Sequence, residues 1–109
     1  MLEVRRTAEF SSWLAALSDA KARAAILVRL SRLASGNAGD ARPVGEGVSE
    51  LRIDVGPGYR AYYMRAERVV LLVLTGGDKR SQDQDIRRAL SMARELRAVV
   101  KTEKPRKPK

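Results

Sequence analysis

Cationic and phenolic side chains gather in two short segments of this 109-residue chain. The segment Gly56–Tyr63 contains Arg60 and Tyr62, and Gly76–Lys79 follows at the end of the next apolar run. Successive residues of a strand point to opposite faces, so Arg60 and Tyr62 share one face. Two adjacent strands would bring both side chains and Lys79 to one basic surface. Since such cations bind phosphate groups, the chemistry that this surface suits best is on a phosphodiester.

The composition excludes several other kinds of site. The chain has no histidine and no cysteine, which removes disulfides, thiol nucleophiles, the usual zinc ligands and the commonest general base at neutral pH. The net charge is +9, and the last nine residues carry only part of it, so the body is basic by itself. Clustered Lys and Arg indicate a polyanionic partner.

A further arginine, Arg52, precedes the first segment in a run that alternates apolar and polar residues. The alternation places Arg52 on the polar face, as a neighbour of Arg60 or Tyr62. The three side chains would form a platform for a nucleic-acid backbone and a stacked base. The alternative is a solvated sheet face on which Arg52 pairs with Glu50 or Asp54.

Lys79 and Arg80 lie between the last apolar strand and the start of a helix, where loops often carry binding groups. With the helix N-terminus beside them, they form a potential phosphate site. The alternative is that Gly76–Lys79 only makes a tight turn. The basic residues of the last helix favour a solvated face over a binding stripe; they are Arg87, Arg88, Arg94 and Arg97.

The first half of the chain predicts a strand followed by a helical hairpin and a loop. Alternation over residues 2–6 indicates the strand, and Thr7 is a helix cap. A second helix begins at Ser18 or Asp19 and ends at Gly36, which is a natural C-cap residue. Residues 36–47 are rich in Gly, Asn, Asp and Pro and predict a connecting loop.

The second half predicts a meander of three strands and a final helix. The strands are expected at 48–55, 59–65 and 69–74, with a type II turn at 56–59 between the first two. The last of them is apolar throughout and belongs at the sheet centre. A capping box at Ser81–Gln84 begins the helix. The fold class is therefore α+β, with an antiparallel sheet of about four strands in the order β-α-α-β-β-β-α.

Taken in order, the short motifs of residues 1–98 resemble those of the RelE/ParE superfamily of toxins, in the phage-derived, Gp49-like branch close to the HigB toxins. The resemblance rests on Val4-Arg5-Arg6-Thr7 with Phe10 and Trp13-Leu14, Gly36-Asn37, Gly39-Asp40, Pro43-Val44, Gly47-Val48, Glu50-Leu51-Arg52-Ile53, Gly58-Tyr59-Arg60, Tyr62-Tyr63, Gly76-Gly77-Asp78-Lys79, Gln82, Asp85-Ile86 and Ala89. It implies a RelE-like toxin domain over residues 1–100. Residues 101–109 are rich in Lys and Pro and have no apolar side chains to pack, so they are expected to form a basic disordered tail. The resemblance also implies an antitoxin from the same operon, often of the helix-turn-helix type.

Relatives of the RelE and HigB type cut mRNA in the ribosomal A site, with the ribose 2′-hydroxyl as nucleophile and without metal or cofactor. By position, Arg60 and Lys79 would stabilise charge on the phosphate, while Arg52 and Arg80 bind the RNA backbone and Tyr62 stacks on a base. The best-known relatives place a tyrosine or histidine at or beyond the final strand, whereas residues 80–109 contain neither. Asp85 and Lys79 remain as alternatives for the acid and base.

Two other functions stay open at this point. One is a ParE-type inhibitor of DNA gyrase, which needs the fold but not the cationic cluster. The other is an inactive, RNA-binding relative. The N-terminus lacks the apolar region of a signal peptide, and no run approaches the roughly 20 apolar residues of a membrane span, so the expected location is the cytoplasm.

Overall fold

The computed structural model describes residues 1–103, and side chains as far as Val99. Its elements are β1 (Glu3–Arg6), α1 (Ala8–Ala16), α2 (Ala20–Ala34), β2 (Ala41–Gly45), β3 (Val48–Ile53), β4 (Tyr59–Glu67), β5 (Val70–Asp78), the 3-10 turn η1 (Lys79–Ser81) and α3 (Gln82–Glu103). The strands form one sheet in the order β1-β5-β4-β3-β2. The α+β prediction is confirmed.

The sheet differs from the prediction at both of its edges. Strand β2 lies inside the predicted loop 36–47 and pairs antiparallel with β3, so the sheet has five strands. Strand β1 pairs parallel with β5, whereas the sheet was expected to be antiparallel. Strand β2 escaped detection because it contains Arg42 and Pro43 and no apolar alternation; an edge strand tolerates proline because one side of it needs no partner.

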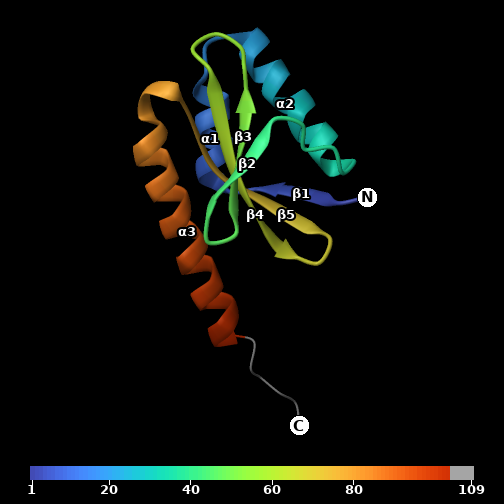
Figure 1. Ribbon diagram of the computed structural model, residues 1–109, viewed down its shortest axis with the longest axis vertical. Helices are drawn as coiled ribbons and strands as arrows, with labels where there is room; N and C mark the ends of the chain where they lie inside the picture. Colours follow the sequence, from blue (N-terminus) through green and yellow to red (C-terminus); the bar gives the residue numbers. More distant parts are fainter. Residues whose placement is uncertain (104–109) are drawn as a thin grey trace.

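Helices cover both faces of the sheet. One core cluster joins α1 and α2 to β3, β4 and β5, with Phe10, Ile26 and Leu51 fully buried. The second joins α3 to the opposite face, around Tyr62 and Leu74. Figure 1 shows α3 running along one side of the sheet and α2 lying on the other. Strand β5 is therefore buried on both faces, as predicted, over residues 70–74, whereas Val69, which was expected to belong to this strand, precedes it and is 53% exposed.

The predicted N-caps of the hairpin helices are confirmed. Thr7 Oγ1 accepts a hydrogen bond from the Phe10 amide at 3.0 Å, and Asp19 Oδ1 accepts one from the Lys21 amide at 2.9 Å. The C-cap residue of α2 is Ser35, one position before the predicted Gly36. Gly36 follows it with φ +89° and donates its N–H to Leu33 O at 2.9 Å. Glycine suits this left-handed position because it has no Cβ.

The final helix starts differently from the prediction. Asp78, rather than Ser81, is the N-cap residue, and its side chain accepts a hydrogen bond from the Arg80 amide at 2.9 Å. Ser81 closes the capping box by accepting from the Asp78 amide at 3.4 Å. The helical path thus begins in η1, at Lys79. At its other end α3 extends to Glu103, so the predicted tail begins within the helix, and its residues 104–109 lie outside the described residues.

The glycine segment Gly76–Lys79 is not the tight turn that was considered. Gly76 and Gly77 belong to β5 and pair with Ala61 and Arg60. Each glycine lies where a helix approaches the strand closely: a Cβ on Gly76 would lie 2.5 Å from Trp13, and a Cβ on Gly77 only 1.7 Å from Asp85 Oδ2. The turn between β3 and β4 spans residues 55–58, one residue earlier than the predicted 56–59. The Gly58 amide closes it by donating to Val55 O at 3.0 Å.

A register shift in β5 aligns this end of the strand with α3. Tyr63 pairs with Val73, but Tyr62 pairs with Thr75, so Leu74 is the extra residue of a bulge. The shift places Gly77 opposite Arg60. No helix among residues 1–103 is long and apolar enough to cross a membrane.

Candidate functional site

Two rows of paired residues cross the sheet on the face that α3 covers. The first row is Arg42, Glu50, Tyr62 and Thr75, and the second is Arg52, Arg60 and Gly77. Paired residues of antiparallel strands point to the same face, so each row is a set of neighbours. The predictions that Arg60 shares a face with Tyr62 and that Arg52 lies beside Arg60 are confirmed.

Glu50 is the centre of the first row, and its side chain is fully buried. Its carboxylate accepts hydrogen bonds from Arg42 Nε at 3.0 Å, Tyr62 OH at 3.0 Å and Gln82 Nε2 at 2.8 Å. Burial raises the pKa of the Glu50 carboxyl, but these hydrogen bonds outweigh burial and the net pKa lies below the ordinary value. Glu50 is therefore an ionised carboxylate at neutral pH, joining β2, β3, β4 and α3.

The structure corrects the prediction for Tyr62. Its side chain has 0% exposure, and its hydroxyl donates to Glu50. Burial, followed by the hydrogen bond to the Glu50 carboxylate, raises the pKa of the Tyr62 phenol far above its ordinary value. A ring packed beneath α3 cannot stack on a base in this arrangement. The prediction failed because alternation along β4 gives the face of a residue but not whether a helix covers it.

Arg60 lies in the second row with only 11% of its side chain exposed. Its Nε is 4.0 Å from Glu50 Oε2, which is too long for a hydrogen bond. Among the described residues, this Nε is a buried nitrogen without a hydrogen-bond partner. A buried donor without a partner is unfavourable by about 1–3 kcal/mol. Arg60 thus lies near the negative charge of Glu50, but its Nε–H makes no hydrogen bond.

Arg52 is bound to Asp40 rather than to Glu50 or Asp54. Its Nε and Nη2 donate to Asp40 Oδ1 at 3.1 and 2.8 Å, and its side chain is 37% exposed. The hydrogen bond from Arg52 holds the pKa of the Asp40 carboxyl below its usual range, and the charges of Arg29 and Arg60 add to this effect. Arg60 is therefore within electrostatic reach of the Arg52–Asp40 pair.

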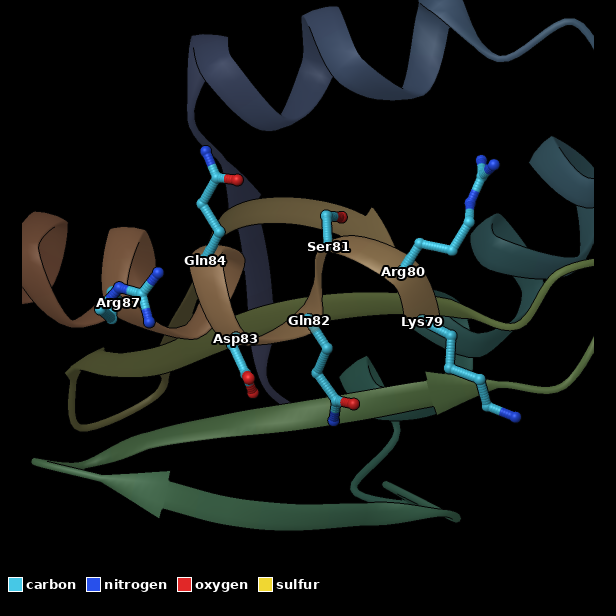
Figure 2. Close-up of a pocket in the computed structure, with 7 residues that line it drawn as sticks. All are labelled: Lys79, Arg80, Ser81, Gln82, Asp83, Gln84 and Arg87. Atoms are coloured by element: carbon cyan, nitrogen blue, oxygen red, sulfur yellow. The ribbon is translucent and has the colours of Figure 1, made fainter.

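Lys79 and Arg80 line an open hollow of about 320 Å³ at the start of α3, together with Ser81, Gln82, Asp83, Gln84 and Arg87. The Lys79 amide donates to Gly58 O at 2.9 Å, which fixes η1 against the β3–β4 turn. Figure 2 shows Gln82 reaching toward the sheet while Arg80 points away from it. The Arg80 guanidinium pairs with Asp78 at 3.0 Å but is 85% exposed.

Asp85 lies one helical turn beyond Ser81 and faces the backbone of Gly77. Its Oδ2 accepts a hydrogen bond from Ser81 Oγ at 2.5 Å. Burial raises the pKa of the Asp85 carboxyl; the bond from Ser81 lowers it, and the carboxylates of Asp78 and Glu9 raise it further, so the net pKa lies above the ordinary value. Since Gly77 pairs with Arg60, the structure brings Asp85 to the second row of the site.

Most of the arginines of α3 have partners elsewhere in the protein. Arg88 binds Glu9 of α1 with its closest contact at 2.6 Å, and Glu9 also accepts from Thr75 Oγ1 at 3.0 Å. Arg94 pairs with Glu46 at 2.6 Å, and Arg97 donates to the Glu46 carbonyl at 2.5 Å. These contacts hold α3 in place across the sheet. From the sequence, a solvated face or a binding stripe was expected for these arginines, but not this structural role.

The sequence was compared with known proteins. The profile of a family described as phage-derived, Gp49-like proteins matches residues 12–98. An uncharacterized protein of Haemophilus influenzae is 44% identical over 95 residues, which cover 87% of this chain and 96% of that protein. The chain belongs to the Gp49-like family. The Gp49-like part of the predicted resemblance is confirmed.

In this Gp49-like chain, motif reasoning missed two residues that shape the site, Glu50 and Gln82. Both residues were among the motifs of the family resemblance, but Glu50 was otherwise considered as a surface partner of Arg52 and Gln82 as part of a helix signal, so neither was given a role in the site. Their hydrogen bond joins residues 32 positions apart. A weak signal was present in the strand itself, since Glu50 lies between the apolar residues Val48 and Leu51 with Arg52 next on its face.

Proposed function

We propose that this Gp49-like protein is the toxin of a type II toxin–antitoxin module and that it cleaves mRNA on the ribosome. The observation that carries the proposal is Arg60, an almost buried cation with an unused donor. Arg52 flanks it in the same row, and the hollow of Lys79 and Arg80 opens at the end of the adjacent strand. Such an arrangement suits an anion with several oxygen atoms, as a phosphodiester is.

The proposed reaction uses the RNA as its own nucleophile. The ribose 2′-oxygen attacks phosphorus, the bond from phosphorus to the 5′-oxygen breaks, and the products carry a 2′,3′-cyclic phosphate and a 5′-hydroxyl. Arg60 and Lys79 stabilise the negative charge that grows on the phosphate oxygens. Arg52 and Arg80, both of which reach the surface, bind the neighbouring backbone phosphates.

Proton transfer in this proposal falls to Asp85 and Lys79. The raised pKa of the Asp85 carboxyl makes it a better proton acceptor than an ordinary aspartate, so Asp85 takes the proton of the 2′-hydroxyl. The Lys79 ammonium supplies the proton that the departing 5′-oxygen needs. Neither step requires a metal, a cofactor or a protein nucleophile.

The proposed partners are the translating ribosome with its mRNA and an antitoxin of the helix-turn-helix type. We expect a small helix-turn-helix gene beside the gene of this protein. Co-expression with the product of that gene should restore growth. Growth arrest that persists at every ratio of the two proteins would refute this pairing.

The decisive experiment expresses the chain in cells and maps the 5′ ends of their mRNA. Cleavage within translated codons is the expected result. Intact mRNA with double-strand DNA breaks would overturn the proposal in favour of a gyrase inhibitor, and the absence of both would leave an inactive, RNA-binding relative.

Substitutions should locate the activity on the site described above. We expect Arg60→Ala and Lys79→Ala to relieve growth arrest while the circular dichroism spectrum stays that of the folded chain. Arg5→Ala is the matched control, because Arg5 is an exposed arginine whose pairing with Glu3 lies on strand β1, at the far edge of the sheet. Full toxicity of both site variants would show that the site is misplaced.

A further inference from the structure

We propose that Glu50 is a positioning residue that fixes the Arg60 guanidinium without using its hydrogen-bond donors. The inference rests on the proposed function, because it concerns how the site presents its phosphate-binding cation. It assigns a role to a buried charge that the proposed reaction does not use.

The Glu50 oxygen nearest to Arg60 already accepts two hydrogen bonds from other directions. A carboxylate offers about four acceptor positions, roughly two on each oxygen. Tyr62 OH and Gln82 Nε2 donate to Oε2 at 3.0 and 2.8 Å, and Arg42 Nε donates to Oε1 at 3.0 Å. Arg60 Nε remains at 4.0 Å from Oε2. Glu50 therefore attracts Arg60 by charge and makes no hydrogen bond to it.

Arg60 has the longest ion pair of the three arginines in the two rows, at 4.0 Å from Glu50. Arg42 pairs with Glu50 at 3.0 Å, and Arg52 pairs with Asp40 at 2.8 Å. Both arginines are substantially exposed, whereas the Arg60 side chain is only 11% exposed. Because Glu50 pairs more closely with Arg42, it neutralises the charge of Arg60 only in part, and this charge stays available to an incoming anion.

The buried Nε of Arg60 favours the binding of an anion. A donor that is removed from water and left without a partner is unfavourable, and an acceptor that reaches it removes the penalty. A phosphate oxygen is such an acceptor. The guanidinium is also already oriented, so binding costs little side-chain entropy. Glu50 thereby makes Arg60 a preorganised anion-binding group.

The test compares cleavage rates on programmed ribosomes in a purified translation reaction. For Glu50→Gln we expect the cleavage rate at saturating ribosome to fall by about tenfold or more, with less than about a threefold change in the half-saturating concentration. In an Arg60→Ala background, Glu50→Gln should change the rate by less than about twofold, because a residue that acts through Arg60 has no effect once Arg60 is gone.

A matched control tests whether the loss of any acidic side chain has this effect. Glu46→Gln removes the same charge from an exposed pair with Arg94 and should leave cleavage unchanged.

Tyr62→Phe provides a second route if Glu50→Gln fails to fold. It keeps the buried ring and the charge of Glu50, and it frees an acceptor position on Glu50 Oε2, the oxygen nearest to Arg60 Nε. Arg60 should then move into a hydrogen bond with Glu50. We expect a downfield shift of the Arg60 Hε resonance in nitrogen-15 NMR spectra, together with slower cleavage.

The possible failures are distinguishable. If the unmodified chain does not cleave mRNA, the proposed function is overturned and this inference falls with it. If that chain cleaves but Glu50→Gln cleaves at the same rate, or if its effect adds fully to that of Arg60→Ala, only the role of Glu50 is overturned. An unchanged Arg60 resonance in Tyr62→Phe would likewise overturn it.

Discussion

Replacing Gly77 with alanine should destabilise the protein through a single contact between β5 and α3. The Cβ of an alanine at this position would lie 1.7 Å from Asp85 Oδ2 and 2.7 Å from Asp85 Cγ. Atoms that are not bonded to each other do not come this close, so the Asp85 side chain must move to another position. Gly77 does not have the positive φ that disfavours alanine, so the substitution causes no strain in the backbone itself.

The cost follows from what Asp85 loses. Forcing an extra carbon into a packed site costs about 1–3 kcal/mol. Rotation of Asp85 also breaks its hydrogen bond to Ser81 Oγ, of 2.5 Å, and a bond to a charged group contributes about 1.5–3 kcal/mol. Return of the carboxylate to water offsets part of this loss, because burial disfavours its charged form. We expect a net loss of about 2–3 kcal/mol, or roughly 8–12 °C in Tm for a domain of this size.

Urea denaturation followed by tryptophan fluorescence measures this loss. Trp13 is the single tryptophan and packs beside Gly76, its ring 5.6 Å from Phe10 and 6.1 Å from Tyr59, so its emission reports the packing of α1 on the sheet. The companion variants are Asp85→Ala and the double variant. Because Asp85→Ala removes the atoms with which the new Cβ collides, Gly77→Ala should cost less than about 0.5 kcal/mol in that background.

The reasoning is refuted by either of two results. A Gly77→Ala variant with the stability of the original chain would show that α3 is not closely packed on β5 at this point. A full loss in the Asp85→Ala background would show that the cost arises elsewhere, for example in the strand itself.

Three further predictions concern buried and paired side chains. Tyr62→Phe leaves Glu50 without one donor and should lower the free energy of unfolding by about 1–2 kcal/mol in urea titrations; no loss would argue against the buried bond. Because the pKa of Tyr62 is raised in the folded state, unfolding should become easier as the pH rises above the unfolded tyrosine pKa of about 10, and ultraviolet titration should show one tyrosine ionising only on unfolding. The hydrogen bond from Arg88 lowers the pKa of Glu9, so Glu9→Gln should cost about 1 kcal/mol at pH 7. That difference should vanish as the pH falls below about 4, and a constant difference from pH 7 to 3 would contradict the assignment.

Local rules determined most of the elements, strand β2 excepted, and the faces of their residues. Thr7 and Asp19 cap helices because a side-chain oxygen accepts from an amide two or three residues ahead, which is a relation within one turn. Arg60 and Tyr62 share a face because the strand repeats every two residues. The sequence also gives the net charge and the absence of histidine and cysteine. These features indicated that Lys and Arg side chains act on a polyanionic partner.

Tertiary structure decided which of these faces meets water. Alternation in β4 is the same whether or not a helix covers the strand, so only the packing of α3 shows that Tyr62 is buried and that Glu50 is surrounded by donors. The glycines of β5 carry no side chain from which their role could be predicted; they matter because Trp13 and Asp85 approach from opposite sides. These contacts join residues of different helices and strands, so their geometry depends on how the elements pack and not on the local sequence.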